Sequence, residues 1–142
     1  MDNKVPAAGS LPLVYACSGC SSAAQLANYL AVRLDRLGHA EMSCIAGLGG
    51  DIPSLVRIAK AGRSIVAIDG CGLKCVQKTL ARHGLRPKVE YELTRLGVKK
   101  RFHADFEQVE AEELLEGIIR EIGGRGGRML QAESTSERSM SD

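Results

Sequence analysis

The chain contains no tryptophan, and its other aromatic residues are three Tyr and two Phe among 142 residues. A hydrophobic core must therefore be built from Ala, Val, Ile and Leu. Such small aliphatic side chains suit helices that pack closely on a parallel sheet. With 44% hydrophobic residues, the chain holds enough apolar material for one domain of ordinary size.

Long apolar runs are also missing, and the segment from Met1 to Pro12 carries Lys4 as its only positively charged side chain. We therefore expect neither a membrane span nor a secretory leader. The formal net charge is only +2, and no basic cluster is interleaved with aromatic residues as in nucleic-acid-binding segments. These features predict a cytoplasmic protein with no membrane or nucleic-acid partner, and they leave a homodimer open.

The sequence alternates short apolar segments with stretches in which apolar residues recur every three or four positions. We expect strands at residues 11–16, 41–46, 64–69 and 88–93, the last at an edge of the sheet. Alternating strands and helices predict a three-layer, doubly wound α/β fold of the Rossmann or flavodoxin type, with a mainly parallel sheet of about four strands. Right-handed crossovers favour the strand order 2-1-3-4, which makes the first and third strands neighbours.

The two ends of the chain differ in character from this middle part. Residues 1–10 have no periodicity and are expected to form a flexible lead, and residues 123–142 are polar enough to form a disordered tail. This leaves residues 11–122 as the α/β domain. Inside it, we expect a flexible loop at residues 47–50 and a last helix starting at Asp105. The inner stripe of that helix is expected to consist of Val109, Leu115, Ile118, Ile119 and Ile122.

The five cysteines are the most informative residues. Cys17 and Cys20 follow the first expected strand, and Cys71 and Cys75 follow the third. The carboxyl ends of neighbouring parallel strands border one crevice, where ligands of doubly wound folds bind. All four thiols are therefore expected at this crevice, with Cys44 one strand away. In a reducing compartment, such spacing is typical of metal-binding or reactive cysteines rather than structural disulfides.

Zinc is the metal that this arrangement favours. Zn²⁺ takes thiolates at about 2.3 Å in a tetrahedron, and two-residue gaps like that between Cys17 and Cys20 are common in its sites. If Cys71 and Cys75 lie on one helical face, their Cβ atoms are roughly 5–6 Å apart. That separation strains a disulfide but not a shared metal. Helix starts, and Lys74 beside the second pair, would offset thiolate charge.

Other residues receive a smaller role. Asp69 ends the third strand and is expected to accept N–H bonds from the turn after it, orienting the ligands, although a plain turn-forming Asp is an equal alternative. His39, His83 and His103 occupy positions typical of helix ends and loops. The run of three basic residues at 99–101 is most simply a solvated face.

Three stretches carry a resemblance to a known family: Cys17-Ser-Gly-Cys20-Ser-Ser, the segment around Cys44 ending in Gly-Leu-Gly-Gly, and Asp69-Gly70-Cys71 followed by Cys75. Together they resemble the DGC-domain family of zinc-binding proteins, which is named for the Asp-Gly-Cys sequence. The resemblance covers about Leu11 to Ile122. It implies a small α/β domain with a cysteine-ligated zinc, and it implies no particular reaction.

Several interpretations remain open at this stage. The cysteines can be small core residues, most plausibly Cys44. A thiol redox protein would use Cys17 and Cys20 as a dithiol pair. A phosphocysteine-type phosphoryl-transfer protein would use Cys17. The low-molecular-weight tyrosine phosphatases, which this loop distantly resembles, need an Arg six residues after the Cys, and Ala23 occupies that position.

For a metal site, the predicted ligands are Cys17, Cys20, Cys71 and Cys75, with Cys44 as an alternate ligand that could serve metal sensing or transfer. Iron–sulfur occupancy of the same thiolates also stays open. Four cysteine ligands would close the coordination shell, whereas exchange of one for water would permit catalysis.

Overall fold

The computed structural model describes residues 11–123. The expected lead at residues 1–10 and the expected tail beyond Gly123 lie outside the described residues. Within residues 11–123, no helix is both long enough and apolar enough to cross a membrane.

The predicted sheet is confirmed. Strands β1 (Leu13–Ala16), β2 (Glu41–Met42), β3 (Ile65–Asp69) and β4 (Val89–Glu92) form a four-stranded sheet in the order β2-β1-β3-β4. All three strand pairs are parallel. Every residue of β1 and β3 is buried, as expected for central parallel strands covered on both faces. In the edge strand β4, buried Val89 and Tyr91 alternate with Glu90 and Glu92.

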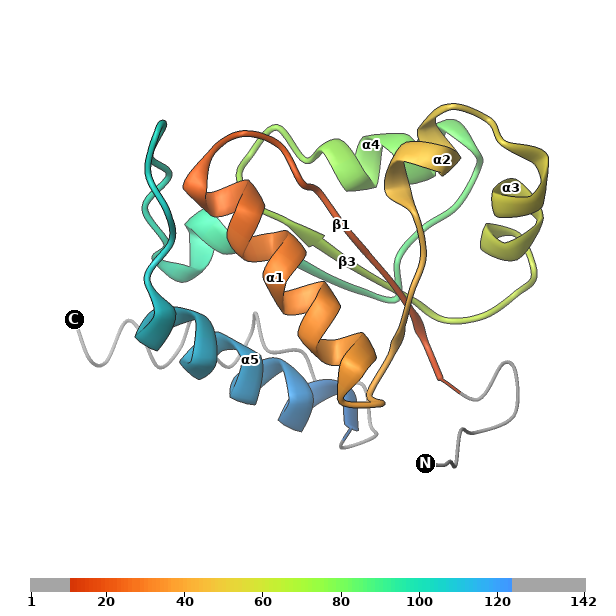
Figure 1. Cartoon of the computed structure of the whole chain (residues 1–142). Coiled ribbons are helices and arrows are strands. Elements are labelled where there is room, and N and C mark those ends of the chain that lie inside the picture. Colours follow the sequence, from red (N-terminus) through yellow and green to blue (C-terminus); the bar gives the residue numbers. More distant parts are fainter. Residues whose placement is uncertain (1–10, 124–142) are drawn as a thin grey trace.

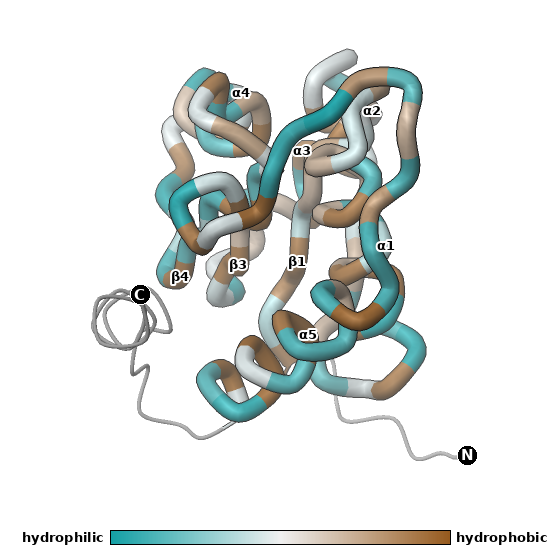
Figure 2. The backbone as a smooth tube through the Cα atoms, turned by 90° about the vertical axis from the view of Figure 1, so that its left-hand side faces the viewer, coloured by the Kyte–Doolittle hydropathy of each residue, from teal (hydrophilic) through white to brown (hydrophobic). Residues whose placement is uncertain are grey.

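Helices cover both faces of this sheet, so the doubly wound arrangement is confirmed as well. The core on one face contains α1 (Ser22–Arg36) and α5 (Gln108–Gly123). On the other face the core draws on α2 (Ile45–Gly49), α3 (Pro53–Ala59) and α4 (Cys75–Arg82). Figure 1 shows α1 and α5 on one side of β1 and β3 and helices α2, α3 and α4 on the other. Figure 2 shows brown apolar residues along these central strands and teal polar residues in the outer loops.

Two local predictions were wrong. The glycine-rich segment after β2 is helix α2 rather than a flexible loop. A Cβ atom on Gly47 would lie 2.1 Å from Leu55 Cδ1, so glycine lets α2 pack directly against α3. Strand β2 is also shorter than expected, which places Cys44 at the residue before α2 instead of inside a strand.

The last helix begins at Gln108, three residues later than predicted, and Val109 in its first turn is not part of the inner stripe. Val109 is 71% exposed, whereas Ile118 is fully buried. The segment after β4 forms a short 3₁₀ helix, η1 (Leu93–Leu96), followed by a loop that returns to the start of α1.

Candidate metal centre at the carboxyl edge of the sheet

Two turns carry the cysteines, one after β1 at residues 17–20 and one after β3 that begins with Asp69-Gly70-Cys71. These two corners lie against each other. Cys17 N donates to Ile68 O at 3.2 Å, which extends the pairing of β1 with β3 by one residue. Gly70 N then donates to Cys17 Sγ at 3.2 Å. The first thiol therefore touches the backbone of the Asp69-Gly70-Cys71 corner directly, at the point between β1 and β3 where the connections leave to opposite faces.

Gly70 makes this close approach possible. A Cβ atom at this position would lie 2.7 Å from Ala23 C and Ala23 O and 2.8 Å from Ala24 N, all of them backbone atoms in the first turn of α1. Gly70 has no positive φ angle, so glycine is required here for space rather than for backbone conformation. The corner after β3 is thus fitted to the start of the helix that follows Cys20.

The start of α4 is organised by Asp69. The Asp69 side chain is fully buried, and its two oxygens accept hydrogen bonds from Val76 N at 2.7 Å and Gln77 N at 3.2 Å. These N–H groups lie beyond the Gly70–Lys74 turn that the sequence predicts as the donor, so the carboxylate caps the helix instead of the turn. A buried carboxylate that satisfies two helix-terminal N–H groups holds the position of the whole first turn.

Cys71 and Cys75 do not share a helical face. The chain makes a turn after Cys71, with Lys74 N donating to Cys71 O at 3.1 Å, and Lys74 adopts a left-handed conformation with φ 53° and ψ 49°. Helix α4 begins only at Cys75. The distance argument from helical spacing therefore does not apply to this pair.

Cys17 is the most strongly perturbed thiol of the centre. The pKa of Cys17 is raised to about 11, mainly by burial and in smaller part by the charges of Asp69, Cys75 and Cys71, while the Gly70 N–H bond acts in the opposite direction. Cys71 and Cys75 are therefore close enough to Cys17 for electrostatic coupling. Without a cation, this corner keeps Cys17 as a neutral thiol.

Asp69 is affected by the same environment. Burial raises the pKa of Asp69, and the nearby Glu92 adds to this, whereas the N–H bonds from Val76 and Gln77 and the charge of Lys74 lower it. The centre thus combines thiols with a desolvated carboxyl group. A positive charge placed among them would favour the ionised form of each group.

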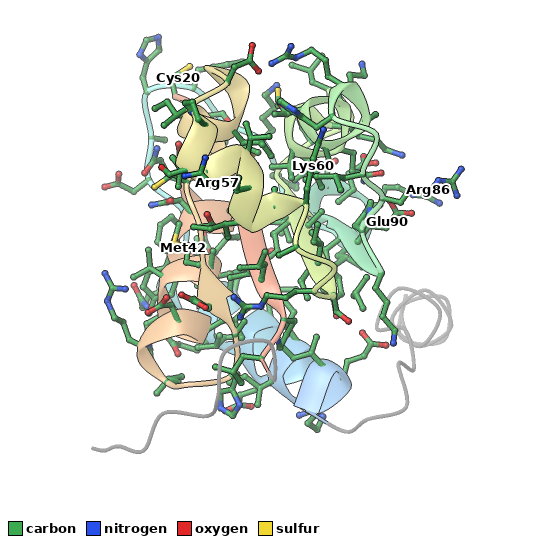
Figure 3. All side chains as sticks on the ribbon, turned by 90° about the vertical axis from the view of Figure 1, so that its right-hand side faces the viewer. Cys20, Met42, Arg57, Lys60, Arg86 and Glu90 are labelled. Carbon is green, nitrogen blue, oxygen red and sulfur yellow. The ribbon has the colours of Figure 1, made fainter. Side chains whose placement is uncertain are left out.

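The two remaining cysteines are more peripheral. Cys20 is exposed in the loop before α1, and Figure 3 shows it at the outer edge of the molecule. Gln25 Nε2 holds this loop by donating to Ser18 O and Gly19 O at 3.2 and 2.8 Å. Cys44 is exposed and follows Ser43, whose N–H donates to Val14 O at 3.1 Å. Cys44 therefore lies beyond β2, on the far side of β1 from Cys71.

Lys100 belongs to the centre and was missed by the sequence interpretation, which placed it on a solvated face. Lys100 Nζ donates to Cys71 Sγ at 3.3 Å. The two residues are separated by 29 positions, and Lys100 lies in a loop without periodicity. No local pattern in the sequence points to this contact.

The thiols do not form a ready-made chelating set. Among residues 11–123, no group of three or more His, Cys, Asp or Glu side chains is arranged to hold a metal ion. The structure brings Cys17, Cys71 and Cys75 into one neighbourhood, with Cys20 on the adjoining loop and Cys44 further away.

Comparison with known proteins identifies the family. The profile of the DGC domain matches residues 13–118. The chain belongs to the DGC domain family. It is also 56% identical over 121 residues to the anaerobic and virulence modulator AnvM of Pseudomonas aeruginosa, an alignment that covers 85% of this chain and 92% of that protein. No solved structure is detectably similar.

The geometry gives the Asp-Gly-Cys sequence of this DGC domain a physical meaning. Asp69 caps α4, Gly70 makes room for α1, and Cys71 presents a thiol next to the corner that carries Cys17. Each of the three positions serves a different contact at the same edge of the sheet.

Proposed function

We propose that this DGC domain binds zinc through Cys17, Cys20, Cys71 and Cys75 and serves in metal handling or sensing, with Cys44 as the alternate ligand. The observation that carries the proposal is the direct contact between the two corners, in which Gly70 N meets Cys17 Sγ at 3.2 Å. This contact holds Cys17 against the turn that carries Cys71, at the edge where ligands bind in doubly wound folds.

The chemistry of the donor set supports zinc. Thiolates are preferred ligands of Zn²⁺, and the ion would compensate the burial and the neighbouring charges that keep Cys17 protonated. The thiols must still move to reach a common ion. Cys20 and Cys75 are exposed, so their side chains can reorient without unpacking the core. Bound zinc would supply a structural crosslink between the two corners.

Asp69 would support such a site indirectly, by holding a segment that carries a ligand. By capping α4, it fixes the helix whose first residue is Cys75. Partners that hold a metal ligand's own segment in place are a general feature of metal sites. We assign Asp69 this orienting role rather than a role as ligand.

Two observations weigh against the other interpretations of Cys17. A phosphate loop needs free N–H groups at its helix start, but Ser22 N donates to Arg101 O and Ala24 N donates to Ser21 Oγ. A nucleophilic thiol needs its thiolate form, and the raised pKa of Cys17 opposes it. Both observations favour a centre that acquires its charge with a metal ion.

The name of the Pseudomonas aeruginosa relative describes a modulator, which accords with a sensing role rather than a metabolic reaction. We therefore place metal binding, and not catalysis, at the centre of the proposal. A catalytic role would require an open coordination position on the metal.

The test is metal analysis combined with thiol titration. Protein purified from zinc-supplied cells is expected to carry about one zinc ion per chain. Its four proposed ligands, Cys17, Cys20, Cys71 and Cys75, are expected to be protected from thiol reagents. Cys17→Ser and Cys71→Ser are expected to lose the ion, while Cys44→Ser serves as the matched control and retains it. Absence of zinc from the wild-type protein, together with five freely titrating thiols, would refute the proposal.

A further inference from the structure

The contact between Lys100 and Cys71 brings an amine and a thiol together outside any helix or strand. Lys100 Nζ donates to Cys71 Sγ at 3.3 Å, and both side chains are half-buried. A thiol with an amine in direct contact can follow an oxidation route that an isolated thiol cannot.

The backbone on each side of Lys100 is anchored. Ser22 Oγ donates to Lys99 O at 3.4 Å and accepts from Arg101 N at 2.9 Å, and Ser22 N donates to Arg101 O at 2.8 Å. Ser22 is itself buried at the start of α1. Figure 1 shows the teal loop around residues 99–101 beside the start of α1.

The side chain of Lys100 is also positioned by an aromatic contact. Its Nζ lies 5.3 Å from the centre of the Phe102 ring, a cation–π distance. Backbone anchoring and the aromatic contact together direct the amine toward Cys71, which gives it a high effective concentration at that sulfur.

We infer that Lys100 and Cys71 form an oxidative modification site, at which hydrogen peroxide converts the pair into a covalent sulfenamide crosslink. In the first step, Cys71 Sγ attacks a peroxide oxygen, the O–O bond breaks, and sulfenic acid and one water form. In the second step, the unprotonated Lys100 nitrogen attacks that sulfur, and the S–N bond forms as the S–O bond breaks. The hydroxyl group leaves with an amine proton as a second water, so the pair loses two hydrogens in total.

Proximity gives the reaction its selectivity. Sulfenic acids condense with whichever thiol or nitrogen is nearest, and at Cys71 the Lys100 nitrogen is in contact. The Cys17 sulfur is engaged in a different contact, because Cys17 Sγ accepts a hydrogen bond from Gly70 N at 3.2 Å. The crosslink would tie the loop around Lys100 to the Asp69-Gly70-Cys71 corner and remove Cys71 from the thiols available to a metal. It does not depend on the proposed zinc site.

The test uses the full chain after removal of metal by a chelator. The protein is treated with hydrogen peroxide, remaining thiols are alkylated, and tryptic peptides are sequenced by mass spectrometry. We expect a peptide pair joined between Lys100 and Cys71 that lacks two hydrogens and separates on treatment with dithiothreitol. Zinc content is measured on a parallel sample, so a failure of the zinc proposal is recorded separately.

Matched variants make the outcome specific. Lys100→Arg keeps the positive charge but presents a guanidinium that stays protonated, so the crosslink is expected to disappear. Lys99→Arg makes the same change at the neighbouring exposed residue and is expected to retain it. Cys71→Ser is expected to abolish it. Circular dichroism of each variant checks the fold.

Three results would overturn the inference. Cys71 found only as a disulfide with another cysteine, or only as sulfinic acid, would show that the amine does not capture the oxidised sulfur. A crosslink that survives Lys100→Arg would assign the nitrogen to another residue. A linked peptide that retains a peroxide oxygen would refute the direct S–N bond.

Discussion

Replacing Gly70 by Ala tests whether the contact between the two corners depends on space at this residue. The added Cβ would lie 2.7 Å from Ala23 C and O and 2.8 Å from Ala24 N. Real Cβ atoms do not approach backbone atoms so closely, so the corner after β3 and the first turn of α1 must separate. Overpacking of this kind costs about 1–3 kcal/mol of unfolding free energy. The shift would also lengthen the bond from Gly70 N to Cys17 Sγ.

The matched control is Gly72→Ala in the same turn. Its Cβ would meet only Glu92 Oε2, at an ordinary contact distance of 3.5 Å. Because alanine restricts the unfolded chain, Gly72→Ala is expected to leave stability unchanged or raise it by about 0.4–1 kcal/mol. Urea unfolding of both variants, followed by circular dichroism, gives the comparison. Equal stability of Gly70→Ala and Gly72→Ala would show that the corners are not fitted to each other as described.

Two further predictions concern the ionisation of Cys17 and the backbone conformation of Lys74. In metal-free protein, the Cys17 thiol ionises near its ordinary value of 9.0 when unfolded and near a pKa of about 11 when folded, so stability is expected to fall as pH rises between these values. Cys17→Ser, which does not ionise there, should show a shallower decline in urea unfolding across this range, and identical slopes would contradict the assignment. Lys74→Gly is expected to raise unfolding free energy by up to about 1 kcal/mol because glycine adopts the left-handed conformation without a Cβ penalty. Lys74→Ala, which also loses the charge but keeps the Cβ, is the control, and a glycine variant no more stable than the alanine variant would argue against strain at this residue.

The order of the sheet could be read from local patterns because it depends on few choices. Apolar runs such as Ile65–Asp69 can be covered on both faces only in a parallel sheet, and right-handed crossovers then restrict the strand order. Segments with weaker patterns were misjudged. The glycines of α2 are typical of a loop in the sequence, because the packing of Gly47 against Leu55 is a tertiary contact that composition does not reveal.

The candidate metal centre also has features that the sequence predicts and features that only tertiary packing determines. Sequence spacing was enough to place Cys17 after β1 and Cys71 after β3, at one edge of the sheet, because strand ends and turns are encoded locally. Tertiary packing determined that Gly70 meets the backbone of α1 and that Asp69 caps α4 from seven residues upstream.

The chain by itself therefore determined the order of the strands and the edge of the sheet that carries Cys17 and Cys71. Only the folded structure decided that Cys71 stands outside the helix and that Lys100 touches its sulfur. The physical reason is the sequence distance between the interacting residues. Strand and helix patterns arise from neighbouring residues, whereas a contact between residues 29 positions apart depends on how the elements between them pack.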